Sequence, residues 1–185
     1  MRVVVGLSGA SGAALGVAVV AALKAAGAET HLVVSRAAER TLHAEIGPSA
    51  LAALREAADV VHAIDDIGAT IASGSFATAG MIVAPCSMRT LSAIAHSLSD
   101  NLLTRAADVH LKERRPLVLL ARETPLHLGH LRAMTAATEM GAVIAPPVPA
   151  FYLKPESVAD IVNQTARRAV DLLRAFPPLA QAWRG

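Results

Sequence analysis

A run of small residues near the start of the chain has the spacing of a turn that could bind an anion. Gly6, Gly9 and Gly12 recur at every third position, after a short β-branched run and before a stretch of helix formers. Backbone N–H groups at a helix start lack partners, and together with the helix dipole they attract a phosphate or a carboxylate. Glycines also let a strand and a helix pack closely. From these residues alone, the two interpretations stand about even.

A second polar turn lies near the middle of the chain. Ser87-Met88-Arg89-Thr90 follows an apolar run and offers two hydroxyls, one cation and the free N–H groups of a helix start. Ordinary N-capping by Ser87 is the simpler interpretation of this turn taken alone. Two such turns in one sheet, however, suit a ligand that carries both a phosphate and a polar ring system. Flavin mononucleotide (FMN) is one such ligand.

A dinucleotide such as NAD is disfavoured by two departures from its usual binding pattern. The glycines are not spaced as G-x-G-x-x-G. The second expected strand ends in Ser35-Arg36, where that pattern requires an acid to hold the ribose 2′-hydroxyl. The glycine turn therefore predicts a mononucleotide more readily than a dinucleotide.

Side chains with possible chemical roles also occur in the second half of the chain. Arg122-Glu123 comes directly after an apolar run, where a surface salt bridge is the simplest explanation. Tyr152 and Trp183 are the only tyrosine and tryptophan, and either suits a core or interface anchor. Lys112 opens a charged run and Arg168 lies on a terminal helix, where exposure is the ordinary condition. Taken singly, none of these residues identifies a reaction.

The sequence contains no convincing metal site. His127 and His130 lie three apart on an expected helix, but no cysteine or carboxylate completes a set of ligands. Asp65-Asp66 is the only acidic pair in a candidate loop, and it lacks the second acidic cluster that would hold a magnesium-bound diphosphate. We therefore expect chemistry that needs no metal.

An alternation of strands and helices must position these side chains. Short apolar runs predict buried parallel strands, and longer stretches closed by glycine or proline predict helices. The expected strands are Arg2–Leu7, Thr30–Val34, a short one near Val60, Met81–Ala84, Leu117–Ala121 and Val143–Ala145. The expected helices are Ala13–Ala26, Arg36–Ile46, Ala50–Ala58, Met88–Ser97, Asn101–Asp108, Pro125–Met140 and Ser157–Ala175.

This alternation predicts the fold class. Strands and helices in turn indicate one α/β domain over residues 1–185, with a doubly wound parallel sheet of the Rossmann-like or flavodoxin-like kind. Ligands of such sheets bind beyond the carboxyl ends of the strands. Because each candidate turn follows such an end, we expect the turns to share one region of the molecule.

Composition narrows the possible partners and location. The apolar fraction of 54% exceeds the roughly 45–50% that is usual, which favours burial of extra surface in a homo-oligomer. Aromatic residues make up 3% and the net charge is +2, so a nucleic-acid partner is not expected. The single cysteine, Cys86, suits the cytoplasm. Segment 3–23 is apolar, but its central glycines and serines favour strand, turn and helix over a membrane span or signal peptide.

Seven short motifs, in this order, resemble those of the UbiX-type flavin prenyltransferase family. The resemblance covers nearly the whole chain, and so many motifs in order are highly specific. The motifs are Ser8-Gly9-Ala10-Ser11-Gly12-Ala13, Ser73-Gly74-Ser75, Ala84-Pro85-Cys86-Ser87, the stretch from Asp100 to Val109, Leu111-Lys112-Glu113-Arg114-Arg115, Arg122-Glu123-Thr124-Pro125 and Pro149-Ala150-Phe151-Tyr152.

The resemblance implies a reaction and an assembly. Members of this family transfer a dimethylallyl group from dimethylallyl monophosphate to reduced FMN without a metal. The product, prenylated FMN, serves UbiD-type decarboxylases. The family implies a flavodoxin-like or Rossmann-like fold, often assembled as a dodecamer. The monophosphate leaving group agrees with the missing magnesium site.

The resemblance also assigns roles to individual residues. Lys112, Tyr152 and Arg168 would hold the prenyl phosphate. Glu123 would act as the acid–base residue, supported by Arg105, Glu45 and Trp183. The residues that would contact FMN are Gly9, Ala10, Ser11, Ser35, Ser87, Met88, Arg89, Thr90 and Arg122.

Two other functions remain open at this point. An FMN-dependent cysteinyl decarboxylase shares the Pro-x-Ser turn and the Asp-Asn-Leu segment, but by family analogy it needs a catalytic histidine in the first half. His43 and His62 lie there, outside any motif of that kind. A non-catalytic, FMN-carrying subunit of an aromatic-acid decarboxylase could dispense with the phosphate-binding residues. Their presence here favours the prenyltransferase.

Overall fold

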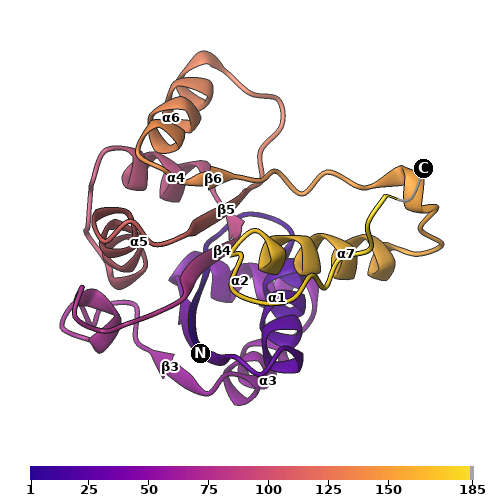
Figure 1. Ribbon diagram of the computed structural model, residues 1–185, viewed down its shortest axis with the longest axis horizontal. Helices are drawn as coiled ribbons and strands as arrows, with labels where there is room; N and C mark the ends of the chain where they lie inside the picture. Colours follow the sequence, from indigo (N-terminus) through magenta and orange to yellow (C-terminus); the bar gives the residue numbers. More distant parts are fainter. Residues whose placement is uncertain (184–185) are drawn as a thin grey trace.

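A six-stranded parallel sheet organises the computed structural model, which describes residues 1–183 (Figure 1). The strand order is β3-β2-β1-β4-β5-β6, so the chain builds outward from β1 and then returns to place β4 on its other side. The strands are β1 (Arg2–Leu7), β2 (Glu29–Val34), β3 (Val60–His62), β4 (Gly80–Cys86), β5 (Leu117–Ala121) and β6 (Val143–Ile144), every pair parallel. The predicted fold class is confirmed.

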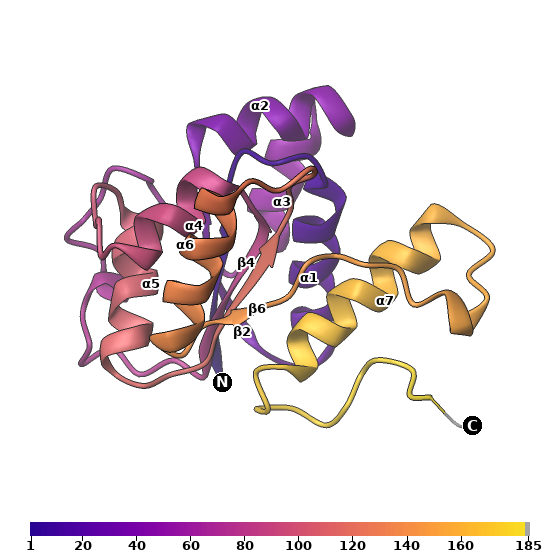
Figure 2. The ribbon, with the colours of Figure 1, turned by 90° about the horizontal axis from the view of Figure 1, so that it is seen from above.

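Helices cover both faces of this sheet. In Figures 1 and 2, α1 and α7 lie on one face, and α4, α5 and α6 lie on the other. The α-helices are α1 (Ala13–Ala25), α2 (Arg36–Glu45), α3 (Ala50–Ala57), α4 (Met88–Ala95), α5 (Leu102–Lys112), α6 (Leu128–Glu139) and α7 (Val158–Asp171). Two single turns of 3₁₀-helix, η1 (Thr70–Ala72) and η2 (Phe151–Leu153), interrupt the loops.

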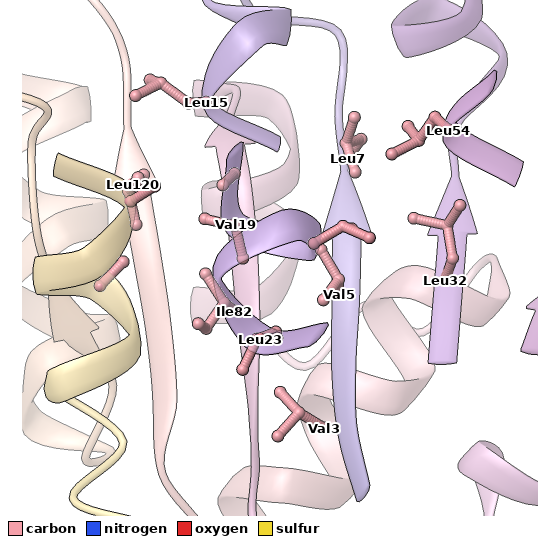
Figure 3. Close-up of a cluster of buried hydrophobic side chains, with 14 of the residues drawn as sticks. Val3, Val5, Leu7, Leu15, Val19, Leu23, Leu32, Leu54, Ile82 and Leu120 are labelled. Carbon is pink, nitrogen blue, oxygen red and sulfur yellow. The ribbon is translucent and has the colours of Figure 1, made fainter. Parts of the chain in front are cut away.

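Alternate side chains of each strand enter two separate cores. Val3, Val5 and Leu7 of β1 point toward α1 and α7, while Val4 points toward α4 and α5. Figure 3 shows the first core, where Leu15, Val19 and Leu23 of α1 meet the strand residues. A strand buried on both faces has no polar side to display, which explains the continuous apolar runs in the sequence.

The first helix packs unusually close to the sheet at Gly16. A Cβ atom there would lie 2.5 Å from the carbonyl oxygen of Ala84 and 2.6 Å from Cδ2 of Leu7. Both distances are shorter than van der Waals contact, so only glycine fits. This contact sets the height of α1 over β1 and β4, and with it the position of the turns that follow those strands.

Several element boundaries differ from the predicted ones. The helix expected from Pro125 begins at Leu128, because the Nδ1 atom of His127 accepts the N–H of Gly129 and caps it. The helix expected to end at Asp108 continues to Lys112, and the strand expected to end at Ala84 continues to Cys86. Capping partners and strand pairing depend on tertiary contacts, which a local sequence pattern does not specify.

The last helix is shorter than predicted. It ends at Asp171 rather than Ala175, because the Asp171 carboxylate accepts the backbone N–H groups of Leu179 and Ala180. The chain therefore turns back along α7. No helix within residues 1–183 has the length and hydropathy needed to cross a membrane.

Candidate active site

The turns after β1 and β4 are joined at the centre of the sheet. The hydroxyl of Ser8 donates to the carbonyl of Pro85 (3.1 Å) and accepts the N–H of Ser87 (2.7 Å). The N–H of Ser8 donates to the same carbonyl at 3.1 Å. Strand order reverses between β1 and β4, and ligands of α/β sheets bind at this switch point. Ser8 is buried, and its hydrogen bonds therefore position both turns. From the sequence it was named only as part of a motif.

The anion at the glycine turn is one of the protein's own carboxylates. Glu45, at the end of α2, accepts the N–H of Gly12 (2.9 Å) and of Ala13 (2.8 Å) at the start of α1. The turn is therefore an anion site, as one interpretation held. It is not free for a phosphate in this structure, because Glu45 fills it.

Glu45 is held in its charged form. Partial burial raises the pKa of its carboxyl group, but hydrogen bonds from Ser11, Ala13 and Gly12, with the positive charge of Arg122, bring the pKa below its usual value. Ser11 and Arg122, both predicted to contact FMN, thus lie close to Glu45. The carboxylate is therefore ionised at neutral pH and is not a proton donor there.

A cavity of about 440 Å³ lies beyond the carboxyl ends of β1, β2, β3 and β4. We call it the switch-point cavity. Its volume is within the roughly 300–1,000 Å³ range of small-molecule sites. Five of the predicted FMN contacts line it, and six further residues complete it. The lining residues are Gly9, Ser35, Ser87, Arg89 and Thr90, together with Arg36, Ala37, Ile64, Asp65, Asn101 and Leu103.

Hydroxyl groups at two helix starts face this cavity. Ser35 caps α2 by accepting the N–H of Ala38 at 3.1 Å, and Ser87 caps α4 by accepting the N–H of Thr90 at 3.3 Å. Capping and ligand binding are thus compatible at Ser87, since the remaining N–H groups of the first turn stay available. The donor set of hydroxyls, N–H groups and cations fits the phosphate and polar ring edge of FMN.

Two ion pairs lie at the cavity. Arg36 Nη2 is 2.6 Å from Asp65 Oδ2, and Arg89 is paired with Asp100. In both cases an arginine in the first turn of a helix meets an aspartate from a neighbouring loop. Asp65, which the sequence analysis considered only as a metal ligand, instead pairs with Arg36.

The other predicted FMN contacts lie near the cavity without lining it. Ala10 is buried in the turn after β1, and Ser11 lies close to the Glu45 carboxylate. Met88 is buried in the core beneath α4. Arg122 follows β5, where its backbone N–H donates to the carbonyl of Cys86 at 3.0 Å.

Three predicted residues meet at a second cavity of about 410 Å³. It lies beside segment 145–157, which joins β6 to α7 and which we call the arm, so we name it the arm cavity. Tyr152, Arg168 and Trp183 line it, with Leu120 of β5 and Ala145 beyond β6. The rings of Tyr152 and Trp183 form an edge-to-face pair with centroids 5.2 Å apart. A cation, a phenol and an aromatic face thus come from three segments that lie far apart in the sequence.

Glu123 and Arg122 do not form the expected surface salt bridge. The Glu123 carboxylate accepts the N–H of Thr124 at 3.1 Å, and the side chain is exposed. Both residues follow the carboxyl end of β5, which lies between β4 and β6 in the sheet, and neither lines either cavity. The desolvation that an acid role requires is not supplied by this chain's own described residues.

Lys112 and Arg105 lie outside both cavities. Lys112 Nζ is 2.6 Å from Glu113 at the last turn of α5, near the amino ends of the strands. Arg105 contacts Asp108 (2.9 Å) and the carbonyl of Ala72 (3.3 Å). One copy of the chain therefore does not bring all predicted phosphate ligands together.

The charged run after Lys112 has a structural role. Arg115 donates to the carbonyls of Gly74 (2.6 Å) and Phe76 (2.7 Å), so it holds the loop that carries the Ser73-Gly74-Ser75 motif. The motif lies beside the end of α5 rather than at the switch-point cavity.

The histidines do not build a metal centre within residues 1–183, where no group of three or more metal-binding side chains occurs. His127 and His130 stack with ring centroids 3.6 Å apart, and His127 is occupied in capping α6. His62, one of the two first-half histidines weighed for the decarboxylase alternative, has its Nε2 atom 3.0 Å from Nδ1 of His31.

Comparison with known proteins agrees with this geometry. A family model described as flavoprotein matches residues 1–170. The flavin prenyltransferase UbiX of Thauera aromatica is 56% identical over 185 residues, covering 100% of this chain and 95% of the relative. The enzyme of the same name from Escherichia coli K12 is 56% identical over 187 residues, covering 100% and 98%.

Two solved structures are similar over their whole length. AnUbiX, in complex with FMN and dimethylallyl pyrophosphate, superposes with a TM-score of 0.95 at 49% identity, covering 100% of this chain and 97% of that one. A dodecameric FMN-dependent UbiX-like decarboxylase from Escherichia coli O157:H7 gives a TM-score of 0.94 at 47% identity, covering 100% of both chains.

Proposed function

We infer that this chain, which belongs to the UbiX-type flavin prenyltransferase family, transfers a dimethylallyl group from a phosphate ester to reduced FMN. The observation that carries the inference is the presence of two cavities, one at the switch point and one beside β5 and α7, within a chain similar to UbiX over its full length. One cavity has the donor set of a flavin site, and the other has a cation and an aromatic face that suit a prenyl phosphate.

Each cavity has a distinct task in this proposal. Hydroxyls and cations of the switch-point cavity orient FMN, which supplies the nucleophilic ring nitrogen when reduced. In the arm cavity, Arg168 neutralises the prenyl phosphate and Tyr152 donates a hydrogen bond to it. Positive charge that develops on the prenyl group as phosphate leaves is stabilised by the face of Trp183, by about 0.5–2 kcal/mol.

Proton transfer falls to two carboxylates. Glu123 follows the carboxyl end of β5 and would protonate the departing phosphate, with the phosphate's own proton as the alternative source. Glu45, held ionised at the glycine turn, would accept a proton through Ser11.

A homo-oligomer completes the site in this proposal. Lys112 and Arg105 line neither cavity of their own chain, so they would serve the site of a neighbouring copy. Large apolar side chains exposed on the arm and at α6 support association of copies. These exposed side chains are Leu126, Leu128, Leu131, Val148, Phe151 and Trp183. A dodecamer is the proposed assembly.

The proposed function is tested by mixing the purified protein anaerobically with reduced FMN and dimethylallyl monophosphate, then weighing the extracted flavin. We expect a gain of one isoprenyl unit with release of phosphate, unaffected by a chelator. Dimethylallyl pyrophosphate in a parallel reaction reports the leaving-group preference. Unmodified flavin from protein shown to bind FMN would contradict the proposal and point to a carrier or a decarboxylase.

The product has a proposed consumer as well. We expect a UbiD-type decarboxylase to take up the prenylated flavin, and addition of the reaction mixture to such an apoenzyme tests this step. Decarboxylase activity that appears only with the complete mixture, and not with FMN alone, is the expected result.

A further inference from the structure

The switch-point cavity contains two arginines, and only one of them was expected to contact FMN. Arg89 belongs to the predicted turn. Arg36 is the first residue of α2, directly after Ser35, and its side chain also lines the cavity. A flavin site must hold a phosphate that carries between one and two negative charges at neutral pH.

The two arginines have matching surroundings. Each lies in the first turn of a helix that begins after a strand of the sheet, α2 after β2 and α4 after β4. Each is paired with an aspartate from a different segment, Arg36 with Asp65 and Arg89 with Asp100. Each guanidinium is thus held in place by a carboxylate.

The Arg36–Asp65 pair is exposed enough to open. The side chains are 79% and 70% exposed, and pairs of this kind contribute little to stability because water competes for both charges. A phosphate offers Arg36 a second and third acceptor oxygen in the planar geometry that a guanidinium prefers. Exchange of Asp65 for a phosphate is therefore favourable for Arg36.

We propose that Arg36 binds the phosphate of FMN, and that Asp65 holds Arg36 over the cavity and competes with the phosphate for it. The inference rests on the proposed function only in taking FMN as the ligand. Arg36 and Asp65 then have opposite effects on affinity. Removing the arginine weakens binding, whereas removing the aspartate charge strengthens it.

Titration of the flavin-free full-length protein with FMN and with riboflavin, followed by flavin fluorescence, tests this assignment. Riboflavin lacks the phosphate and so isolates its contribution. For Arg36→Gln we expect the Kd for FMN to rise about tenfold and the Kd for riboflavin to change less than about twofold. For Asp65→Asn we expect the Kd for FMN to fall about two- to fivefold, with less effect at high salt.

Glu39→Gln is the matched control. It breaks another exposed ion pair of α2, Glu39 with Arg55 at 2.8 Å, which does not line the cavity. We expect no change in either Kd. Arg36→Lys keeps the charge but loses the planar geometry, and an intermediate Kd is expected.

Three results would overturn the assignment. If Arg36→Gln binds FMN with the wild-type Kd, Arg36 does not contact the phosphate. Equal weakening of FMN and riboflavin would mean that Arg36 only supports the cavity wall. Weaker FMN binding by Asp65→Asn would mean that the ion pair is a structural tie. Prenyl transfer by the wild type is measured separately, so normal transfer with any of these results leaves the proposed function standing.

Discussion

Glu45 illustrates how a single side chain can change the meaning of a motif. Its carboxylate takes the N–H groups of Gly12 and Ala13, which the glycine spacing had marked for an external anion. The spacing was informative about chemistry, because an anion does lie there. The spacing did not indicate which group supplies the anion, because Glu45 is 33 residues away in the chain from Gly12.

Glu123 is the residue on which the proposed acid role depends. We expect Glu123→Gln to retain FMN binding and to lose prenyl transfer by about 10²–10⁴-fold, because the amide cannot protonate the leaving phosphate. The measurement is the rate of prenylated flavin formation beside an FMN titration. Glu56→Gln, an exposed change on α3, is the control, and near wild-type turnover by Glu123→Gln would exclude the role.

At the scale of elements, close packing positions the site. Gly16 allows α1 to approach the carbonyl of Ala84, and the Ser8 hydroxyl then joins the turn after β1 to the turn after β4. His110 anchors α5 in a similar way, since its ring accepts the Thr78 hydroxyl (2.8 Å) and donates to the Ala106 carbonyl (2.7 Å).

Gly16→Ala should destabilise the protein by about 1–3 kcal/mol, because the added Cβ meets backbone and core atoms that are already in contact. Gly68→Ala is the matched control, since a Cβ there meets only Asp66 Oδ1 at 3.6 Å. Urea unfolding of both variants measures the difference. Equal free energies of unfolding for the two variants would show that α1 can shift away from the sheet without destabilising the protein.

Protonation of His110 should lower the free energy of unfolding at acidic pH. Burial lowers the pKa of its imidazole from 6.5 to about 4. The unfolded chain therefore binds the proton first, so this contribution is complete above pH 6.5 and is lost as the pH falls toward 4. The loss is on the order of 3 kcal/mol.

Urea unfolding at pH 7 and at pH 4.5 measures this dependence. His110→Gln should show a smaller difference between the two pH values than the wild type, whereas His96→Gln, at an exposed position, should not. An unchanged pH dependence in His110→Gln would assign the acid sensitivity to other groups.

For the whole molecule, the question is which copy supplies each part of the site. Glu123 stands at the carboxyl ends of the strands, whereas Lys112 lies at the last turn of α5 near their amino ends. Exposed apolar side chains on the arm and on α6 form the surfaces through which copies would meet.

Co-expression of Lys112→Ala with Glu123→Gln tests a shared site. Each variant alone should be inactive, and mixed oligomers should regain part of the wild-type activity, because some sites receive both intact residues. The double variant co-expressed with wild type controls for dilution. Absence of any recovery in oligomers shown to be mixed would place Lys112 outside the site.

Much of this protein follows from local sequence. Continuous apolar runs identify β1, β2, β4 and β5 because strands buried on both faces need them, and the order of seven motifs identified the family. The turns at Ser35 and Ser87 followed as well, because a cap residue acts on its own helix.

Other features depend on residues that come into contact only when the whole domain has folded. The carboxylate of Glu45 at α1, the Arg36–Asp65 pair, and the approach of Tyr152 to Trp183 join segments between 29 and 33 residues apart. Helix ends at His127 and Asp171 likewise depend on where a side chain finds its partner. Periodicity reports the environment of a residue along its own element, whereas such contacts arise from strand order and crossover, so they became visible only in three dimensions.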